Sequence, residues 1–402
     1  MVRYLLSIIL VIFVSCNQAP NWKGAWKINL ELQEQKLPFI IELFEIGGGF
    51  AGKLHNSTEE LELISQNSVD DKKLRFEIGA HYAVLELEFV NEGELKGFWV
   101  RTNKEDYKVP LTGKKTSESN ELYSEFAQID SDINVEGRWE VEFREGKKGL
   151  GLFKQQGSRI TGSILTNTGD YRFLVGKVEG DQLYLQGFDG VFSFIFKLKV
   201  RDESLSGTMF SGKSYNTTLK AIRNEGFKLA NAYEMTKLTD KKFATYLGES
   251  LTGNRVDLAL GEFKDKPKVI QLFGSWCPNC VDETHFFNDW IASNPELAPK
   301  ISFIALAFEN FESKAQAVKA VKKSKKKLSM NYPVILIDYN RKIKPEDILP
   351  IDKGRAFPTT LFLDKNNKII KVHTGFSGPA TGPFFEKFKE SFQKTIVDLV
   401  SN

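Results

Sequence analysis

The chain has 402 residues, of which 41% are hydrophobic and 27% are charged, and its formal net charge is +3. The length predicts two or three domains, with enough apolar residues for several cores. So small a net charge gives no indication of a nucleic-acid partner, which would favour a strongly basic surface.

The beginning of the chain predicts a secretory signal. Arg3 precedes the apolar run YLLSIILVIFVS, which is short for a membrane-spanning helix. The tetrapeptide FVSC resembles the lipobox of bacterial lipoproteins, with phenylalanine where leucine is usual. The resemblance implies that residues 1–15 are a lipoprotein signal peptide, that Cys16 carries the lipid, and that residues 16–23 form a tether. A plain signal peptide or an uncleaved anchor is the alternative; each places the protein where disulfide chemistry is permitted.

Two similar β modules are expected next, at residues 24–115 and 134–224, joined by a polar linker at 116–133. GAW in the first module returns as GRW in the second, FAGKL as ITGSI and ELKGFWV as SLSGTMF, at a spacing of roughly 110 residues. The strands alternate apolar and polar residues, which predicts antiparallel barrels or sandwiches. Trp26 and Trp139, which open the modules, are interpreted as plugs of a packed core, although barrels of this size can hold ligands.

The last part of the chain predicts an α/β domain with a mixed sheet at residues 248–402, after a second linker at 225–247. Short apolar runs such as KVIQLFG, ISFIALAF and YPVILID alternate with helical stretches, and TTLFLD and KIIKVHT read as a hairpin. The basic stretch KKSKKK is interpreted as a solvated helix face.

The stretch WCPNC, with Cys277 and Cys280, is the strongest functional signal. A zinc site would need four ligands, and no second pair of ligands follows. A structural disulfide across so short a loop would stabilise the chain little. Thiol–disulfide exchange fits better, because the pair follows a buried strand and begins a helix, whose N-terminus favours a thiolate. Cys277 is then expected to be exposed and to attack, Cys280 to resolve the mixed disulfide, Pro278 to occupy the first helical turn and Trp276 to form a flat apolar wall.

Residues 248–400 resemble the thioredoxin-fold domain of the TlpA/ResA type, the exported, membrane-tethered thiol–disulfide oxidoreductases. The resemblance is carried by LTGNRVDLALGEFKDKPKVIQLFGSWCPNC, CVDE, AFPTTLFLD and KIIKVHTGF. It implies a glutamate near the cysteines, Glu283, and a cis peptide bond between Phe357 and Pro358 at the substrate groove. Gln271 stands where cytoplasmic thioredoxins have an aspartate, which leaves Glu283 or water as the proton acceptor for Cys280.

The leading hypothesis is an envelope thiol–disulfide oxidoreductase, lipid-anchored and facing the periplasm, that reduces disulfides of exported proteins. It would need a membrane thiol protein as its electron donor, and no cofactor or metal is expected. The β modules would be spacers, recognition modules or docking modules. Two alternatives remain: the β modules bind a ligand or partner and the redox domain is subsidiary, or the same cysteines serve an oxidase or isomerase.

Overall fold

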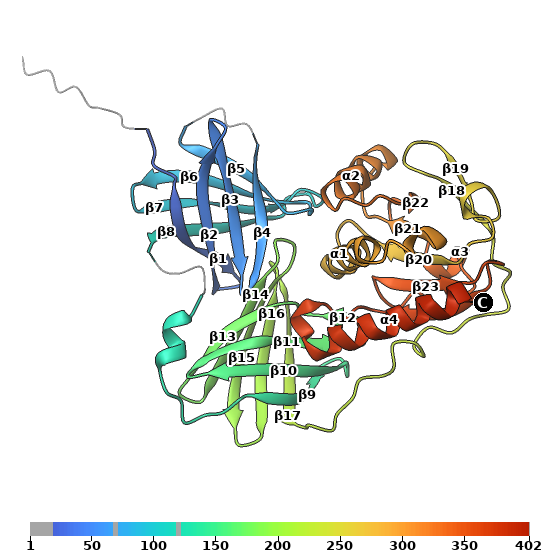
Figure 1. Ribbon diagram of the computed structural model, residues 1–402. Coiled ribbons are helices and arrows are strands. Elements are labelled where there is room, and N and C mark those ends of the chain that lie inside the picture. Colours follow the sequence, from blue (N-terminus) through green and yellow to red (C-terminus); the bar gives the residue numbers. More distant parts are fainter. Residues whose placement is uncertain (1–18, 67–70, 118–121, 402) are drawn as a thin grey trace, which may run out of the picture.

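The first β module is a closed antiparallel barrel, in which each strand pairs with its sequence neighbours and the last strand pairs with the first. The computed structural model describes residues 19–66, 71–117 and 122–401, so the proposed signal peptide and Cys16 lie outside the described residues. In Figure 1 this barrel, barrel 1, is coloured blue to cyan. Its strands are β1 (Gly24–Leu32), β2 (Gln35–Ile46), β3 (Gly49–Asn56), β4 (Glu59–Gln66), β5 (Lys73–Ile78), β6 (Ala83–Asn91), β7 (Glu94–Arg101) and β8 (Lys108–Thr116).

The second β module, barrel 2, closes in the same way, because its last strand β17 pairs with its first strand β9 and because β10 pairs with β11. A two-residue strand, β12 (Gly169–Asp170), pairs with the end of β11 and lies outside the barrel wall. The wall consists of β9 (Gly137–Phe143), β10 (Lys148–Gln156), β11 (Arg159–Thr166), β13 (Leu174–Glu179), β14 (Gln182–Phe188), β15 (Ser193–Arg201), β16 (Ser204–Ser211) and β17 (Tyr215–Arg223).

The two barrels repeat individual side-chain contacts as well as sequence motifs. Trp26 and Trp139 are both fully buried, and each indole donates a hydrogen bond to the carbonyl four residues earlier, at 2.8 and 2.9 Å. At Gly97 and Gly207 a Cβ atom would lie about 2 Å from a carbonyl oxygen of the neighbouring strand, at 1.9 and 2.0 Å. The tryptophans therefore pack the two cores, as their interpretation as plugs requires.

The remaining elements form an α/β domain with a five-stranded mixed sheet in the order β22-β21-β20-β23-β24. The three consecutive apolar runs form the parallel strands, and the last two strands are antiparallel. Helices pack on the sheet, as Figure 1 shows. The elements are β18 (Tyr246–Glu249), β19 (Arg255–Asp257), η2 (Gly261–Phe263), β20 (Lys268–Phe273), α1 (Pro278–Ser293), η3 (Ala298–Lys300), β21 (Ser302–Phe308), α2 (Lys314–Lys327), β22 (Val334–Asp338), α3 (Pro345–Ile348), β23 (Thr359–Leu363), β24 (Ile369–Thr374), η4 (Pro379–Thr381) and α4 (Pro383–Ser401).

In the two segments expected as linkers, the described residues pack on neighbouring domains. Between the barrels, the short helix η1 (Ser124–Gln128) follows Leu122, which is buried against both barrels. After β17 the chain passes beneath α4 to the far side of the α/β domain (Figure 1). On the way the ring of Tyr233 lies 4.8 Å from the ring of His373. Within the three described ranges, no helix has the length and apolar character needed to cross a bilayer.

Barrel 2 fills one end of barrel 1. The ring of Phe188, in barrel 2, lies 4.7 Å from that of Phe39 and 5.1 Å from that of Trp99, on β2 and β7 of barrel 1. The Trp99 indole donates to the carbonyl of Gly190 at 2.9 Å, and Asn56 accepts from the Phe188 amide at 3.0 Å. Phe188 belongs to the core of barrel 1, so the two barrels share one apolar interior at this junction.

Barrel 1 also docks on α2, which corrects our interpretation of the basic stretch. Lys323 and Lys327 pair with Glu77 of β5 at 2.8 and 2.9 Å and are only partly exposed. Burial alone would raise the pKa of Glu77, but the two lysines lower it to about 2. Part of the stretch is therefore an interdomain contact, because these two lysines point from α2 towards barrel 1 instead of solvent.

Candidate active site

The two cysteines lie where β20 gives way to α1, as the sequence predicts. Cys277 is the N-cap of α1, Pro278 is its first residue, and Cys280 is joined to Cys277 by a disulfide bond. The Cys280 amide donates to Cys277 Sγ at 3.1 Å. The same N–H also donates to the Cys277 carbonyl at 3.1 Å, so this amide of the first helical turn is shared with the first sulfur, where it would stabilise a thiolate in the reduced state.

The segment before β23 faces the first sulfur. The peptide bond between Phe357 and Pro358 is cis, the geometry expected from the sequence. Cys277 Sγ lies 3.4 Å from the carbonyl oxygen of Phe357, so the two segments are in contact. The rings of Trp276 and Phe357 lie 5.4 Å apart, and the Trp276 indole donates to the Phe308 carbonyl at 2.9 Å. Trp276 therefore stands beside the disulfide as an apolar wall.

A buried carboxyl group lies beneath the disulfide. Glu283 of α1 is fully buried and accepts hydrogen bonds from Gln271 at 2.9 Å and from Thr360 at 2.7 Å. Burial raises its pKa to about 7, and these two hydrogen bonds offset part of the rise. The Gln271 amide also donates to the carbonyl of Cys280 at 3.3 Å. Gln271 therefore connects Glu283 to the second cysteine.

A second buried carboxyl group supports the loop before the cysteines, and our sequence reasoning missed it. Glu309, directly after β21, accepts from the amide of Ser275 at 2.8 Å and from its hydroxyl at 2.7 Å. Burial raises the pKa of Glu309 to about 7, against the effect of both hydrogen bonds. The available signal was an acidic residue at the carboxyl end of a buried parallel strand, where sites of α/β sheets gather.

Comparison with known proteins agrees with this geometry. Residues 236–384 match the Redoxin family model. These residues are a Redoxin domain of the TlpA/ResA type. The domain is a thioredoxin-like protein disulfide oxidoreductase.

Two curated relatives are the thiol-disulfide oxidoreductases ResA of Bacillus thuringiensis subsp. konkukian and Bacillus cereus. Each is 26% identical over 153 residues, which is 37% of this chain and 79% of the relative. Among solved structures, a putative thiol:disulfide interchange protein DsbE from Chlorobium tepidum is 20% identical with a TM-score of 0.30, covering 40% of this chain and 99% of its own. A secreted thiol-disulfide isomerase from Corynebacterium glutamicum is 17% identical with a TM-score of 0.31, covering 44% of this chain and 97% of its own.

The exposure expected for Cys277 is wrong, because barrel 2 covers the active site of the Redoxin domain. Only 3% of Cys277 is exposed. The covering segment, which we call the cap turn, is residues 167–172 after β11. A Cβ atom on Gly375 would lie 3.0 Å from the backbone carbon of Thr168, and Asp170 accepts from the Gly378 amide at 2.7 Å. The cap turn thus packs on the Redoxin loop that follows β24, beside the cysteines.

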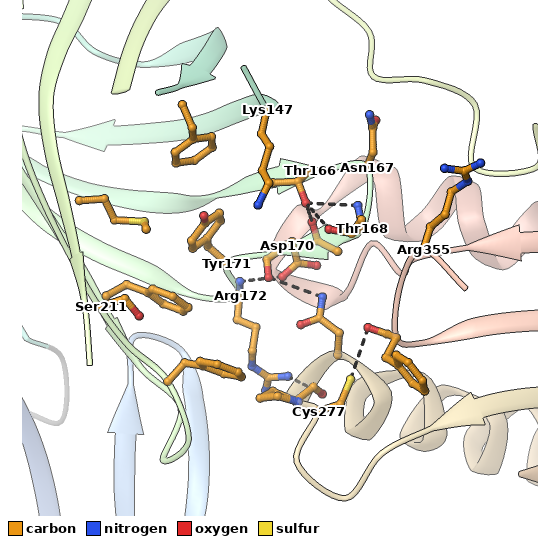
Figure 2. Close-up of a pocket in the computed structure, with 18 of the residues that line it drawn as sticks. Lys147, Thr166, Asn167, Thr168, Asp170, Tyr171, Arg172, Ser211, Cys277 and Arg355 are labelled. Carbon is orange, nitrogen blue, oxygen red and sulfur yellow. Dashed lines mark hydrogen bonds between the residues drawn. The ribbon is translucent and has the colours of Figure 1, made fainter. Parts of the chain in front are cut away.

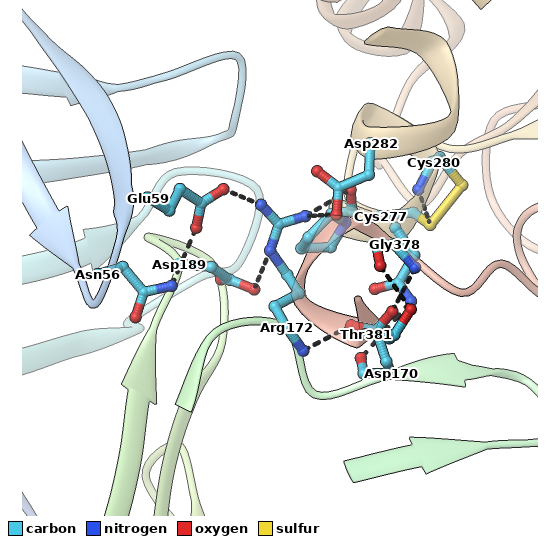
Figure 3. Close-up of polar contacts among 12 residues, drawn as sticks. Asn56, Glu59, Asp170, Arg172, Asp189, Cys277, Cys280, Asp282, Gly378 and Thr381 are labelled. Carbon is cyan, nitrogen blue, oxygen red and sulfur yellow. Dashed lines mark hydrogen bonds and ion pairs between the residues drawn. A yellow bond between two sulfur atoms is a disulfide. The ribbon is translucent and has the colours of Figure 1, made fainter. Parts of the chain in front are cut away.

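Arg172, at the end of the cap turn, joins all three domains (Figure 3). Its guanidinium pairs with Asp282 of α1 and with Glu59 of barrel 1, and lies 3.8 Å from Asp189 of barrel 2. It also donates to the carbonyl of Pro278, between the two cysteines, at 3.0 Å. Burial by itself would lower the pKa of Arg172, but the three carboxylates raise it, so the guanidinium stays charged. Sequence reasoning missed Arg172, which no local pattern distinguishes.

A cavity of about 800 Å³ separates the rim of barrel 2 from the Redoxin domain and reaches Cys277 (Figure 2). One wall is formed by the ends of barrel strands, and the other by the cysteine loop and the segment before Phe357. In the described part of the chain, no group of three or more His, Cys, Asp or Glu residues is placed to hold a metal ion.

Proposed function

We propose that this protein reduces disulfide bonds of other exported proteins by a dithiol–disulfide cycle of Cys277 and Cys280. The single observation that carries the proposal is the disulfide at the N-terminus of α1, in contact with the cis Phe357–Pro358 segment and above the buried Glu283. A disulfide at a helix N-terminus can release a stabilised thiolate when it is reduced. The contact of Cys277 with the Phe357 carbonyl places the reactive sulfur beside a backbone edge. An extended segment of the substrate protein, which we call the client, can approach this edge.

The cycle begins with the reduced chain. The Cys277 thiolate attacks one sulfur of the client disulfide, a bond forms between the two, and the second client sulfur leaves as a thiolate and takes up a proton. Cys280 then loses its proton and attacks Cys277 Sγ, which releases the first client sulfur as a thiol. Two electrons pass to the client, and the chain is left with the disulfide that the structure contains.

Glu283 is the proposed proton acceptor in the second step. A carboxyl group with a pKa of about 7 is poised to take up and release protons near neutral pH. The hydrogen bonds of Gln271 hold it on the side of Cys280. Gln271 is in this view a positioning residue.

The cellular setting is proposed on the N-terminal sequence. The lipobox-like FVSC favours a lipid anchor at Cys16 and a position in the bacterial envelope facing the periplasm. A membrane thiol protein would then return two electrons to the disulfide after each cycle, because one cysteine pair stores only one electron pair. The ResA relatives are consistent with a site outside the cytoplasm.

The test is the reduction potential of the cysteine couple in the intact chain, measured in thiol redox buffers. A potential near about −270 mV supports a reductase, whereas one near about −120 mV means that the protein oxidises its clients. The Cys280→Ser variant should in addition accumulate mixed disulfides with client proteins through Cys277. Absence of any reversible couple would sink the proposal.

The alternative hypothesis, in which the barrels bind a ligand or partner and the redox domain is subsidiary, is less favoured. Barrel 2 and Cys277 line the same cavity, so whatever enters the rim of this barrel meets the cysteine.

A further inference from the structure

The rim of barrel 2 that faces the active site is open and aromatic. The Tyr171 ring lies 4.8 Å from that of Phe194 and 5.9 Å from that of Phe143, and Phe192 stacks on Phe194 at 5.9 Å. Tyr171, Phe192 and Phe194 are only half-buried, and all four rings line the cavity. The end of barrel 1, by contrast, is filled by Phe188. Half-buried rings grouped in a concave site are typical of ligand pockets.

The entrance of the cavity carries positive charge from both walls. Lys147 comes from the β9–β10 loop of barrel 2, and Lys353 and Arg355 come from the Redoxin domain (Figure 2 labels Lys147 and Arg355). Lys147 and Lys353 are exposed, and neither forms an ion pair with a described residue. The cavity is also lined by Glu145, Asp170 and Asp189, which accept hydrogen bonds from Thr217 or from backbone amides. Lys147 and Lys353 form no ion pair among the described residues, and at the entrance they favour an acidic occupant.

The shape of the site limits what can reach the disulfide. Cys277 is 3% exposed, and it lies in the wall of the cavity. About 800 Å³ lies within the range of pockets for ligands of moderate size. A short extended segment fits such a volume, whereas the surface of a folded domain does not.

We propose that this cavity is the client-specificity site. It binds an extended segment in which an aromatic or large aliphatic side chain, near the client cysteine, enters the ring cluster of barrel 2, while a neighbouring acidic residue meets Lys147 and Lys353. This inference rests on the proposed disulfide exchange at Cys277 and adds a substrate class to it.

The first test compares peptide disulfides on the intact reduced chain. One peptide has phenylalanine and glutamate beside its cysteine, the second has alanine for phenylalanine, and the third has lysine for glutamate. Hydroxyethyl disulfide, which is too small to use the rings, is the reference. We expect the first peptide to exceed the second at least about tenfold in kcat/KM. Its advantage over the third should shrink at high salt.

Variants then locate the effect in the cavity. Phe192→Ala should remove the preference for phenylalanine, and Lys353→Glu should shift the preference towards the lysine peptide. Phe98→Ala is the matched control, since Phe98 is 42% exposed on barrel 1 and does not line the cavity. Phe98→Ala should turn over all three peptides and hydroxyethyl disulfide at the wild-type rate. For Phe192→Ala and Lys353→Glu the readout is the ratio of kcat/KM between peptides, which a general loss of activity does not alter. Equal turnover of the three peptides, or an unaltered Phe192→Ala variant, would overturn the inference and leave the redox proposal intact.

Binding without chemistry keeps the two proposals apart. A peptide with serine in place of its cysteine should bind the oxidised chain in calorimetry, and should bind the Phe192→Ala variant at least about tenfold more weakly. Absence of binding refutes the specificity site. Binding without turnover of any disulfide supports the site and refutes the proposed reductase activity.

Discussion

Replacing Arg172 by methionine should weaken the junction of the three domains and uncover Cys277. Arg172 is 4% exposed in its side chain, and its partners Asp282, Glu59 and Asp189 are 11, 13 and 4% exposed. Removing one member of a buried ion pair costs about 3–5 kcal/mol, because the remaining charges lose their compensation in a site of low polarity. The hydrogen bond to the Pro278 carbonyl is lost as well, at about 1 kcal/mol.

The assay has two readouts. Calorimetry of the oxidised chain should show a loss of about 3–5 kcal/mol in the stability of the assembled domains. Alkylation of Cys277 in the reduced chain should become faster, because the cap turn leaves the active site. The stability loss should diminish as the pH falls, since burial already raises the pKa of Asp282 and its neutral form needs no counter-charge.

Two further variants make this result interpretable. Arg255→Met is the control for removal of an arginine, because Arg255 is 61% exposed, pairs with Asp257 at 3.1 Å and lies over the ring of Tyr246. We expect a loss of about 1 kcal/mol or less in the free energy of unfolding. The double variant Arg172→Met with Asp282→Asn should be less destabilised than the sum of its single variants. The reasoning would be refuted if the free energy of unfolding of Arg172→Met lay within about 1 kcal/mol of the wild-type value and its alkylation rate were unchanged.

Three other predictions concern single carboxyl groups and one glycine. Turnover should rise as the pH passes about 7, because Glu283 accepts the proton of Cys280 only in its ionised form. Glu283→Gln should remove this step from the pH–rate profile. Glu309→Gln should keep it, although burial raises the pKa of Glu309 as well. The contact of Glu77 with α2 should stabilise the protein above pH 4.5 and lose its effect as the pH falls towards 2, so acid unfolding of Glu77→Gln should lack this component. Gly375→Ala should displace the cap turn and speed alkylation of the reactive thiol. Gly382→Ala should not, because Gly382 also has a positive φ but an added Cβ there would have no neighbour within 4 Å.

The sequence was informative wherever local pattern decides the structure. Alternation of apolar residues predicted both β modules, and the position of the cysteines between an apolar run and a helix predicted the redox centre. Arg172 and its carboxylate partners could not be found in this way. Glu59 and Asp282 lie more than a hundred residues from Arg172 on either side and meet it only after three domains have packed.

The burial of Cys277 escaped prediction for the same reason. Its local sequence favours an exposed N-cap, whereas in the folded chain Cys277 belongs to a buried cluster that consists mostly of Redoxin-domain residues. The covering cap turn comes from another domain, where TNTGD reads as an ordinary turn between strands. Whether such a turn faces solvent or an active site depends on domain packing, which periodicity does not encode.

The insertion of Phe188 into barrel 1 sets an order of events during synthesis. A ribosome delivers barrel 1 first, and at that moment the place between Phe39 and Trp99 is still empty. Gly190, in the segment that fills this end of barrel 1, lies 91 residues after Trp99. The nascent barrel therefore presents an apolar opening for several seconds at ordinary translation rates. During that interval it is a natural site for a chaperone to hold, and for one growing chain to capture the Phe188 segment of another.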